Sequence, residues 1–140
     1  MFLLDTNILS AIIGARPVPE VAAWITRQPS ERLFTAAICQ AEILSGIAVM
    51  PDGRRRAALE SAARAMFTED FEGRLLAFDG AAAVAYAELY AVRRQIGRPA
   101  GTVDLMIASV ARVHGASVVT RDSGGFDGCG LTVINPWTAS

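Results

Sequence analysis

The chain has 140 residues, of which 52% are hydrophobic, so we expect one domain with a sizeable core, spanning residues 1–140. The formal net charge is −1, which means that no overall field attracts nucleic acid and any polyanion must be bound locally. All 13 cationic residues are Arg, and the absence of Lys excludes a P-loop nucleotidase and Schiff-base chemistry, because both need a Lys side chain.

The predicted elements alternate between strand and helix along the chain. Strands are predicted at residues 1–4, 33–35, 75–78, 117–120 and 131–134. Helices are predicted from about residue 7 and over residues 19–28, 37–50, 54–67, 80–97 and 103–114. Strands separated by helices predict an α/β fold, with a central parallel sheet flanked by helices.

Four acidic residues stand at the edges of apolar segments. Asp5 follows the first strand directly and Asp122 follows the fourth, so both lie where open α/β sheets bind ligands. Glu42 lies in an apolar helical segment, and Asp104 lies in the first turn of a helix that is otherwise apolar or small. Each has an ordinary alternative: a turn residue for Asp5 and Asp122, a solvent-facing residue for Glu42, and a helix-dipole charge for Asp104.

The four acids together indicate a metal site. Carboxylates gathered in one region repel one another unless a cation neutralises them. Carboxylate oxygens prefer Mg²⁺ or Mn²⁺ over zinc. We therefore expect a site for a divalent cation at the carboxyl ends of the strands.

Four short motifs occur in a fixed order along almost the whole chain. They are Leu3–Asn7, Ala41–Gly46, Asp104–Ala108, and Val119–Asp122 with Phe126 beyond it. These motifs resemble those of PIN domains. Gly73–Asp79 and Asn135–Trp137 are similar to the corresponding segments of FitB-like members of the VapC-type toxins.

The resemblance implies a PIN-like three-layer fold and a Mg²⁺- or Mn²⁺-dependent endoribonuclease. It places Asp5, Glu42, Asp104 and Asp122 on the acidic catalytic and metal-binding positions. Asp5 and Asp104 are expected to bind the metal directly, while Glu42 and Asp122 complete a second metal position or hold water. Two positions depart from the family pattern: Ser109 stands where Ala is common, and Asp122 replaces a frequent Asn.

The small polar pair beside the first acid, Thr6 and Asn7, falls on substrate-positioning residues of the family. Their hydrogen bonds are expected to fix a ligand or a phosphate oxygen. A carboxylate-bound metal would activate water and stabilise charge on the phosphate, so no nucleophilic side chain is required.

The resemblance also implies partners. They are RNA as substrate, a cognate antitoxin that inhibits the toxin of a type II pair, and DNA only indirectly, through the antitoxin. A mean hydropathy of +0.35 suggests apolar surface buried against another subunit, and the stripe Tyr86, Leu89, Tyr90 and Arg93 suggests a two-fold homodimer.

We expect a cytoplasmic protein. No apolar run is long enough to cross a membrane, and no charged region precedes the first strand, so we expect no signal peptide. Cys39 and Cys129 are expected to be reduced thiols, because two Cys do not make a disulfide framework in a domain of this size.

Two rival functions remain open. One is a non-catalytic binding module that only holds an antitoxin or a DNA-bound complex, although such a module would have no need of the acids. The other is a phosphohydrolase with Asp5 as nucleophile, which would require an acid at the position of Asn7 and an accompanying Lys. A Ser-His-Asp triad built on His114 is disfavoured, because no exposed Ser elbow is present.

Two further segments have open interpretations. The run Arg54–Arg56 is either the solvated start of a helix or a contact for RNA phosphates or acidic antitoxin residues. The glycines between Gly124 and Gly130 predict a flexible loop and not a dinucleotide fingerprint, because no helix follows at the required place.

Overall fold

A five-stranded parallel sheet forms the centre of the molecule. The computed structural model describes residues 1–138. The strands are β1 (Phe2–Leu4), β2 (Leu33–Ala36), β3 (Leu75–Leu76), β4 (Ser117–Val119) and β5 (Val133–Ile134), and their order across the sheet is β3-β2-β1-β4-β5. Every neighbouring pair is parallel, as the alternation of elements predicts.

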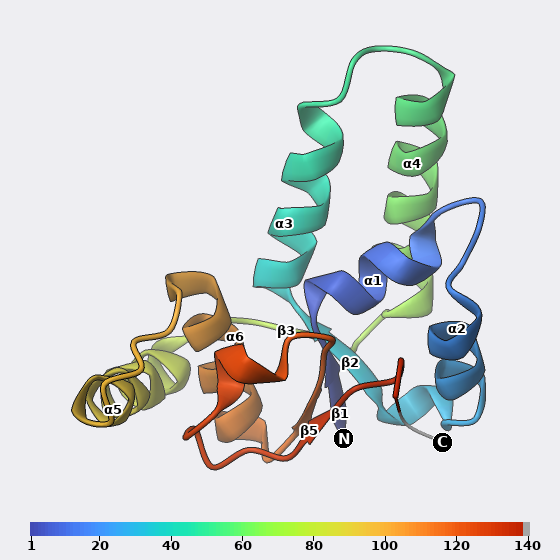
Figure 1. Cartoon of the computed structure of the whole chain (residues 1–140). Coiled ribbons are helices and arrows are strands. Elements are labelled where there is room, and N and C mark those ends of the chain that lie inside the picture. The colour runs from blue at the N-terminus through green and yellow to red at the C-terminus, as the bar shows by residue number, and fades with distance from the viewer. Residues whose placement is uncertain (139–140) are drawn as a thin grey trace.

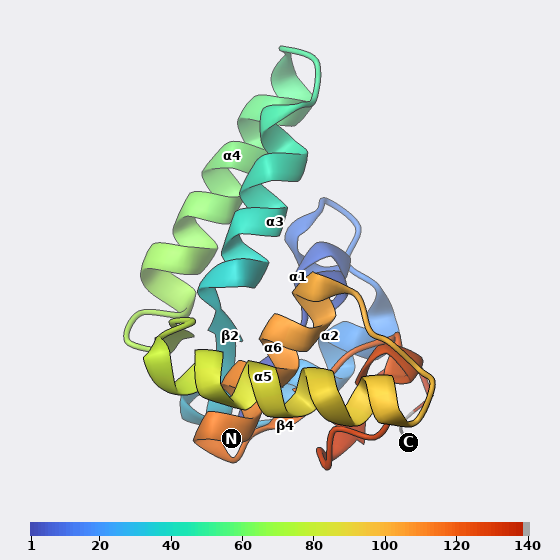
Figure 2. The same cartoon turned by 90° about the vertical axis from the view of Figure 1, so that its left-hand side faces the viewer.

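Within residues 1–138, six α-helices connect the strands. They are α1 (Thr6–Ile13), α2 (Pro19–Thr26), α3 (Ala37–Ala48), α4 (Arg54–Ala65), α5 (Gly80–Gln95) and α6 (Thr102–His114). Three short turns join them: 3₁₀ turns at Ser30–Arg32 and Ser123–Phe126, and a π-helical turn at Met66–Asp70. Helices α5 and α6 pack together at one side of the sheet, while α3 and α4 stand side by side and project away from it (Figures 1 and 2).

The topology creates a switch point in the sheet. From β1 the chain builds outward through β2 to β3, and then crosses back to place β4 on the other side of β1. Successive crossovers therefore run in opposite directions from β1, which leaves a crevice beyond the carboxyl ends of β1 and β4. Asp5 and Thr120 are the first residues after these two strands.

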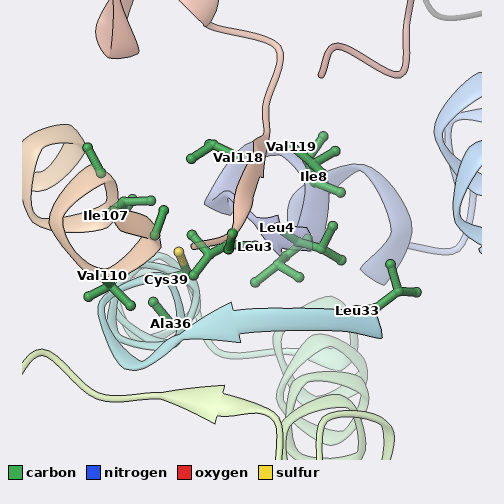
Figure 3. Close-up of a cluster of buried hydrophobic side chains, with 14 of the residues drawn as sticks. Leu3, Leu4, Ile8, Leu33, Ala36, Cys39, Ile107, Val110, Val118 and Val119 are labelled. Carbon is green, nitrogen blue, oxygen red and sulfur yellow. The ribbon is translucent and has the colours of Figure 1, made fainter. Parts of the chain in front are cut away.

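The core holds the central strands rigidly. Leu3 and Leu4 of β1 and Val118 and Val119 of β4 are fully buried, and Figure 3 shows them facing side chains from β2, α3 and α6. A parallel strand covered on both faces reads as a continuous apolar run, which is the pattern at Phe2–Leu4. The end of β1 is therefore a fixed platform for Asp5.

Several predicted boundaries differ from the structure. β3 ends at Leu76 and not at 78, because as an edge strand it pairs only with the last residues of β2, Thr35 and Ala36. The helix predicted over 54–67 ends at Ala65 and continues as the π-helical turn. The predicted glycine loop contains the 3₁₀ turn Ser123–Phe126, which is anchored by the buried Phe126.

The proposed dimer stripe on α5 is corrected by the structure. Leu89 and Arg93 are only 2% and 4% exposed, and Tyr86 is half-buried against Phe78. Only Tyr90 of the four is exposed. Leu89 and Arg93 thus pack inward and are not available to a second subunit, while the homodimer itself stays a prediction.

Other expectations can be compared directly. Cys39 and Cys129 are unpaired and buried, as expected for free thiols. Burial raises the pKa of Cys39 to about 11, with a further contribution from the Asp5 carboxylate, so the thiol stays protonated. None of the helices within residues 1–138 has the length and apolarity that a membrane crossing needs.

Candidate functional site

A cleft of about 530 Å³ lies at the switch point. Asp5, Glu42 and Asp104 line it from β1, α3 and α6, so three of the four predicted acids meet at one surface. Thr6 and Asn7 also line the cleft. Asp122 does not line it but lies next to Asp104 across Gly125, since a methyl carbon on Gly125 would be 2.6 Å from Oδ2 of Asp104 and 3.6 Å from Oδ2 of Asp122.

Asp5 is the most tightly held of the acids. Asp5 is 5% exposed, and its main-chain N–H donates to the carbonyl of Val119 at 2.9 Å. This hydrogen bond ties Asp5 to the end of β4. The Asp5 Oδ1 atom accepts the N–H of Thr6 at 2.7 Å, where α1 begins. Asp5 is therefore both a helix-capping residue and a cleft carboxylate.

The buried hydroxyl of Thr120 organises this corner of the site. It donates to Oδ2 of Asp5 at 2.8 Å, and it accepts the side-chain N–H of Asn7 and the main-chain N–H of Asp122, each at 3.1 Å. One hydroxyl thus fixes the orientation of Asp5 and the backbone position of Asp122. Sequence reasoning missed this role, because a Thr at the end of a strand has no distinctive pattern.

The polar side-chain atoms of Thr6 and Asn7 form hydrogen bonds with other protein groups. The Thr6 hydroxyl donates to Oε1 of Glu42 at 2.5 Å, which holds an otherwise exposed side chain at the cleft. The Asn7 side-chain carbonyl accepts the N–H of Arg121 at 3.1 Å. Both residues therefore support acids or the loop after β4.

The environment disfavours negative charge on two of the acids. Burial raises the pKa of Asp5, and the carboxylates of Asp104 and Glu42 raise it further, whereas hydrogen bonds from Thr120 and Thr6 lower it. Burial also raises the pKa of Asp104, as do the carboxylates of Asp122 and Glu42. Burial is the larger cause of both shifts, and repulsion between the neighbouring carboxylates adds to it.

The charge of Arg93 lowers the pKa of Asp104. The Arg93 side chain is 4% exposed and is occupied elsewhere: it donates to the carbonyls of Arg98 at 2.6 Å, Gly124 at 3.4 Å and Asp127. Arg93 thus anchors the loop that follows Asp122 to α5. The sequence offered no signal for this contact with the loop.

The donor set fits a hard divalent cation. Every candidate ligand is a carboxylate oxygen, and a positive ion would relieve the repulsion that raises the pKa of Asp5 and Asp104. No three His, Cys, Asp or Glu side chains within residues 1–138 already stand close enough to hold an ion together. Binding of an ion would therefore require the carboxylates of the cleft to move closer together.

Comparison with known proteins places the chain in context. Residues 2–128 match the family model described as PIN domain. The plasmid stability protein StbB of Pseudomonas syringae pv. tomato is 42% identical over 99% of this chain and 100% of that protein. The VapC ribonuclease Y4jK of Sinorhizobium fredii is 40% identical over 98% of each chain.

Toxin FitB of Neisseria gonorrhoeae is 33% identical over 98% of this chain and 99% of that protein. Among solved structures, FitAcB from Neisseria gonorrhoeae superposes with a TM-score of 0.93 at 32% identity, covering 99% of this chain and 100% of that chain. The similarity is thus continuous over the length of the chain and includes the strands and helices that carry the acids.

Proposed function

Because the chain belongs to the PIN domain family, we propose that it acts as one domain over residues 1–140 and hydrolyses RNA phosphodiester bonds with a divalent metal ion. Its similarity to a VapC ribonuclease and to a toxin supports this proposal. We further infer that it is the cytoplasmic toxin of a type II toxin–antitoxin pair.

The observation that carries the proposal is the crowding of carboxylates beyond β1 and β4. Asp5 and Asp104 both have raised pKa values, which means that the fold maintains an electrostatically unfavourable arrangement in a cleft. Perturbed acids in a cleft mark a functional site more often than a structural one. If these acids had only a structural role, the fold would not need carboxylates at the switch point between β1 and β4 that lack a cationic partner within residues 1–138.

Each residue has a role in this proposal. Asp5 and Asp104 bind the ion directly, and Mg²⁺ is the expected ion, with Mn²⁺ as a substitute. Such an ion would polarise a phosphodiester oxygen and lower the pKa of the attacking water. Glu42 in the cleft and Asp122 beside Asp104 add to the acidic cluster, and either would accept a proton from that water.

The neighbouring hydroxyls position the acids. Thr120 holds Asp5 and Thr6 holds Glu42, so neither carboxylate is free to turn away from the cleft. Asn7 joins this network through Thr120 and the N–H of Arg121. We assign Thr6 and Asn7 to the positioning of the acids and, through them, of the substrate.

We also propose two protein partners. An antitoxin would inhibit the enzyme by offering a basic side chain to the acidic cleft, since an Arg fork suits unpaired carboxylates. The chain would form a homodimer through apolar surface outside the α5 stripe, and exposed residues such as Leu44, Val49 and Val84 supply such surface. DNA would be contacted only through the antitoxin.

RNA cleavage by the purified protein tests the enzymatic proposal. Labelled RNA should remain intact in EDTA and be cut when Mg²⁺ or Mn²⁺ is restored. Asp5→Asn and Asp104→Asn proteins, checked for unchanged helix content, should not cut it. An EDTA-resistant nuclease, or full activity in Asp104→Asn, would refute the metal-dependent mechanism and leave a binding module as the alternative.

Growth tests the toxin assignment separately. Expression of the chain alone should arrest growth, and co-expression of the adjacent small open reading frame should restore it. The Asp104→Asn protein is the matched control, because it should fold without arresting growth.

A further inference from the structure

The cleft has a second wall that is chemically different from the acids. Arg121 and Trp137 line it together with Asp5. Arg121 lies just beyond β4 and Trp137 just beyond β5, so the two residues come from neighbouring strands at the same edge of the sheet. This wall carries a cation and an aromatic ring in place of carboxylates.

The two side chains are held against each other. The Arg121 guanidinium carbon is 4.9 Å from the centre of the Trp137 ring. Asn135 joins their backbones: its side-chain oxygen accepts the N–H of Trp137 at 3.0 Å, and its side-chain nitrogen donates to the carbonyl of Arg121 at 3.5 Å. The pair is therefore organised before any ligand arrives.

Arg121 is available to a ligand. Its side chain is exposed, and among residues 1–138 the ion pairs of arginine involve Arg56, Arg98 and Arg112 and leave Arg121 without a carboxylate partner. A free guanidinium beside an acidic cleft can offset the repulsion that the acids exert on a polyanion.

We propose that Arg121 and Trp137 form a subsite for one unpaired nucleotide of the RNA substrate, an inference that rests on the proposed ribonuclease function. Arg121 donates to a phosphate oxygen, and the Trp137 ring stacks against the base. Aromatic rings and Arg planes bind bases in this way without strong sequence preference. A base within a duplex is covered by its neighbours, so the subsite selects single-stranded RNA.

Binding of a short labelled oligoribonucleotide to the metal-free protein in EDTA tests this subsite without cleavage. The single strand should bind more tightly than the same sequence in a duplex, and it should quench Trp fluorescence. The other tryptophan, Trp24, is 6% exposed and packs on Phe2, so it serves as an internal control. Quenching should persist in Trp24→Phe and disappear in Trp137→Phe.

Paired variants separate stacking and charge from packing. Trp137→Leu keeps an apolar side chain but should lose about tenfold in affinity, while Trp137→Phe should retain most of it. Arg121→Gln should reduce the slope of log affinity against log salt by about 0.7, the value for one phosphate contact on a single strand. Arg27→Gln, which removes an exposed charge that does not line the cleft, should leave the slope unchanged.

Several outcomes would overturn the subsite. They are equal binding of single strand and duplex, wild-type affinity in Trp137→Leu, and an unchanged salt slope in Arg121→Gln. If Trp137→Leu binds RNA normally but loses the antitoxin, the pair belongs to the antitoxin interface. Cleavage assays distinguish the subsite from the proposed ribonuclease function. An active Trp137→Leu enzyme with an unchanged KM for RNA would refute the subsite alone. A wild-type protein that binds RNA but does not cleave it with Mg²⁺ present would refute the ribonuclease function alone.

Discussion

Gly125 packs directly against Asp104, so that a methyl carbon on Gly125 would lie 2.6 Å from Oδ2 of the carboxylate. This separation is far below ordinary van der Waals contact. The backbone of Gly125 does not have a positive φ, so the constraint comes from the carboxylate and not from the chain conformation. The loop after Asp122 thus sets the position of an acid on α6.

Gly125→Ala should impair activity without unfolding the protein. The added methyl group can be accommodated only if the Asp104 carboxylate rotates away, and we expect about a tenfold or greater loss of RNA cleavage. Gly124→Ala is the matched control, because its methyl carbon would be 3.7 Å from the nearest atom, Oδ1 of Asp122. Cleavage rates and melting temperatures of both variants check this, and equal activity in the two would contradict it.

Thr120→Val should damage both stability and activity. The substitution keeps the shape of the side chain but removes the hydroxyl that contacts Asp5, Asn7 and Asp122. Leaving buried polar groups unpaired costs about 1–3 kcal/mol in the free energy of unfolding. Urea denaturation should show that loss, and Thr120→Ser should restore both properties. A fully active Thr120→Val protein would mean that Asp5 needs no orienting partner.

Asp104→Asn should stabilise the metal-free protein. Burial and the carboxylates of Asp122 and Glu42 raise the pKa of Asp104, so its charged form is a net cost to the native state at neutral pH. The amide removes that cost with little change in shape. Thermal unfolding in EDTA should show a higher melting temperature than wild type, even though cleavage falls by more than about a hundredfold. A lower melting temperature would argue against charge crowding.

The effect of Mg²⁺ on stability should depend on pH. In the metal-free protein the raised pKa values of Asp5 and Asp104 mean that the native state binds protons more tightly than the unfolded chain. The charges of these two carboxylates therefore destabilise the native state, and that destabilisation is relieved as the pH falls toward the ordinary Asp pKa of 3.8. Protons and metal compete for the same carboxylates. The rise in melting temperature caused by Mg²⁺ should therefore shrink steadily as the pH falls below neutrality. A Mg²⁺ effect that is independent of pH would place the ion elsewhere.

The sequence predicts the sheet because its local signals agree with the global fold. Phe2–Leu4 and Val118–Val119 are apolar runs of strand length, and both prove to be buried central strands. Because β4 pairs with β1, the carboxyl ends of the two strands place Asp5 and Thr120 side by side. The sequence pattern does not reveal this pairing. Gly115 after α6 has the left-handed conformation typical of a helix end, and it marks that boundary correctly.

The remaining features depend on contacts between distant segments. Arg93 shares the helical stripe of the buried Leu89, yet no local pattern predicts that its guanidinium packs against the loop that holds Gly124 and Asp127. The pairing of Arg121 with Trp137 depends on the turn made by Asn135. Such hydrogen bonds and packing contacts arise only after the sheet has formed, so no local pattern predicts them.

Binding of Mn²⁺ is the measurement that tests the acidic metal site most directly. The electron paramagnetic resonance signal of free Mn²⁺, followed as protein is added near neutral pH, reports binding without any need for substrate. We predict that the wild-type protein binds the ion and that Asp5→Asn and Asp104→Asn bind it far more weakly, while Glu88→Gln, an exposed acid of α5 that does not line the cleft, binds normally. Equal binding by wild type and Asp104→Asn, or no binding by wild type at millimolar Mn²⁺, would contradict the account.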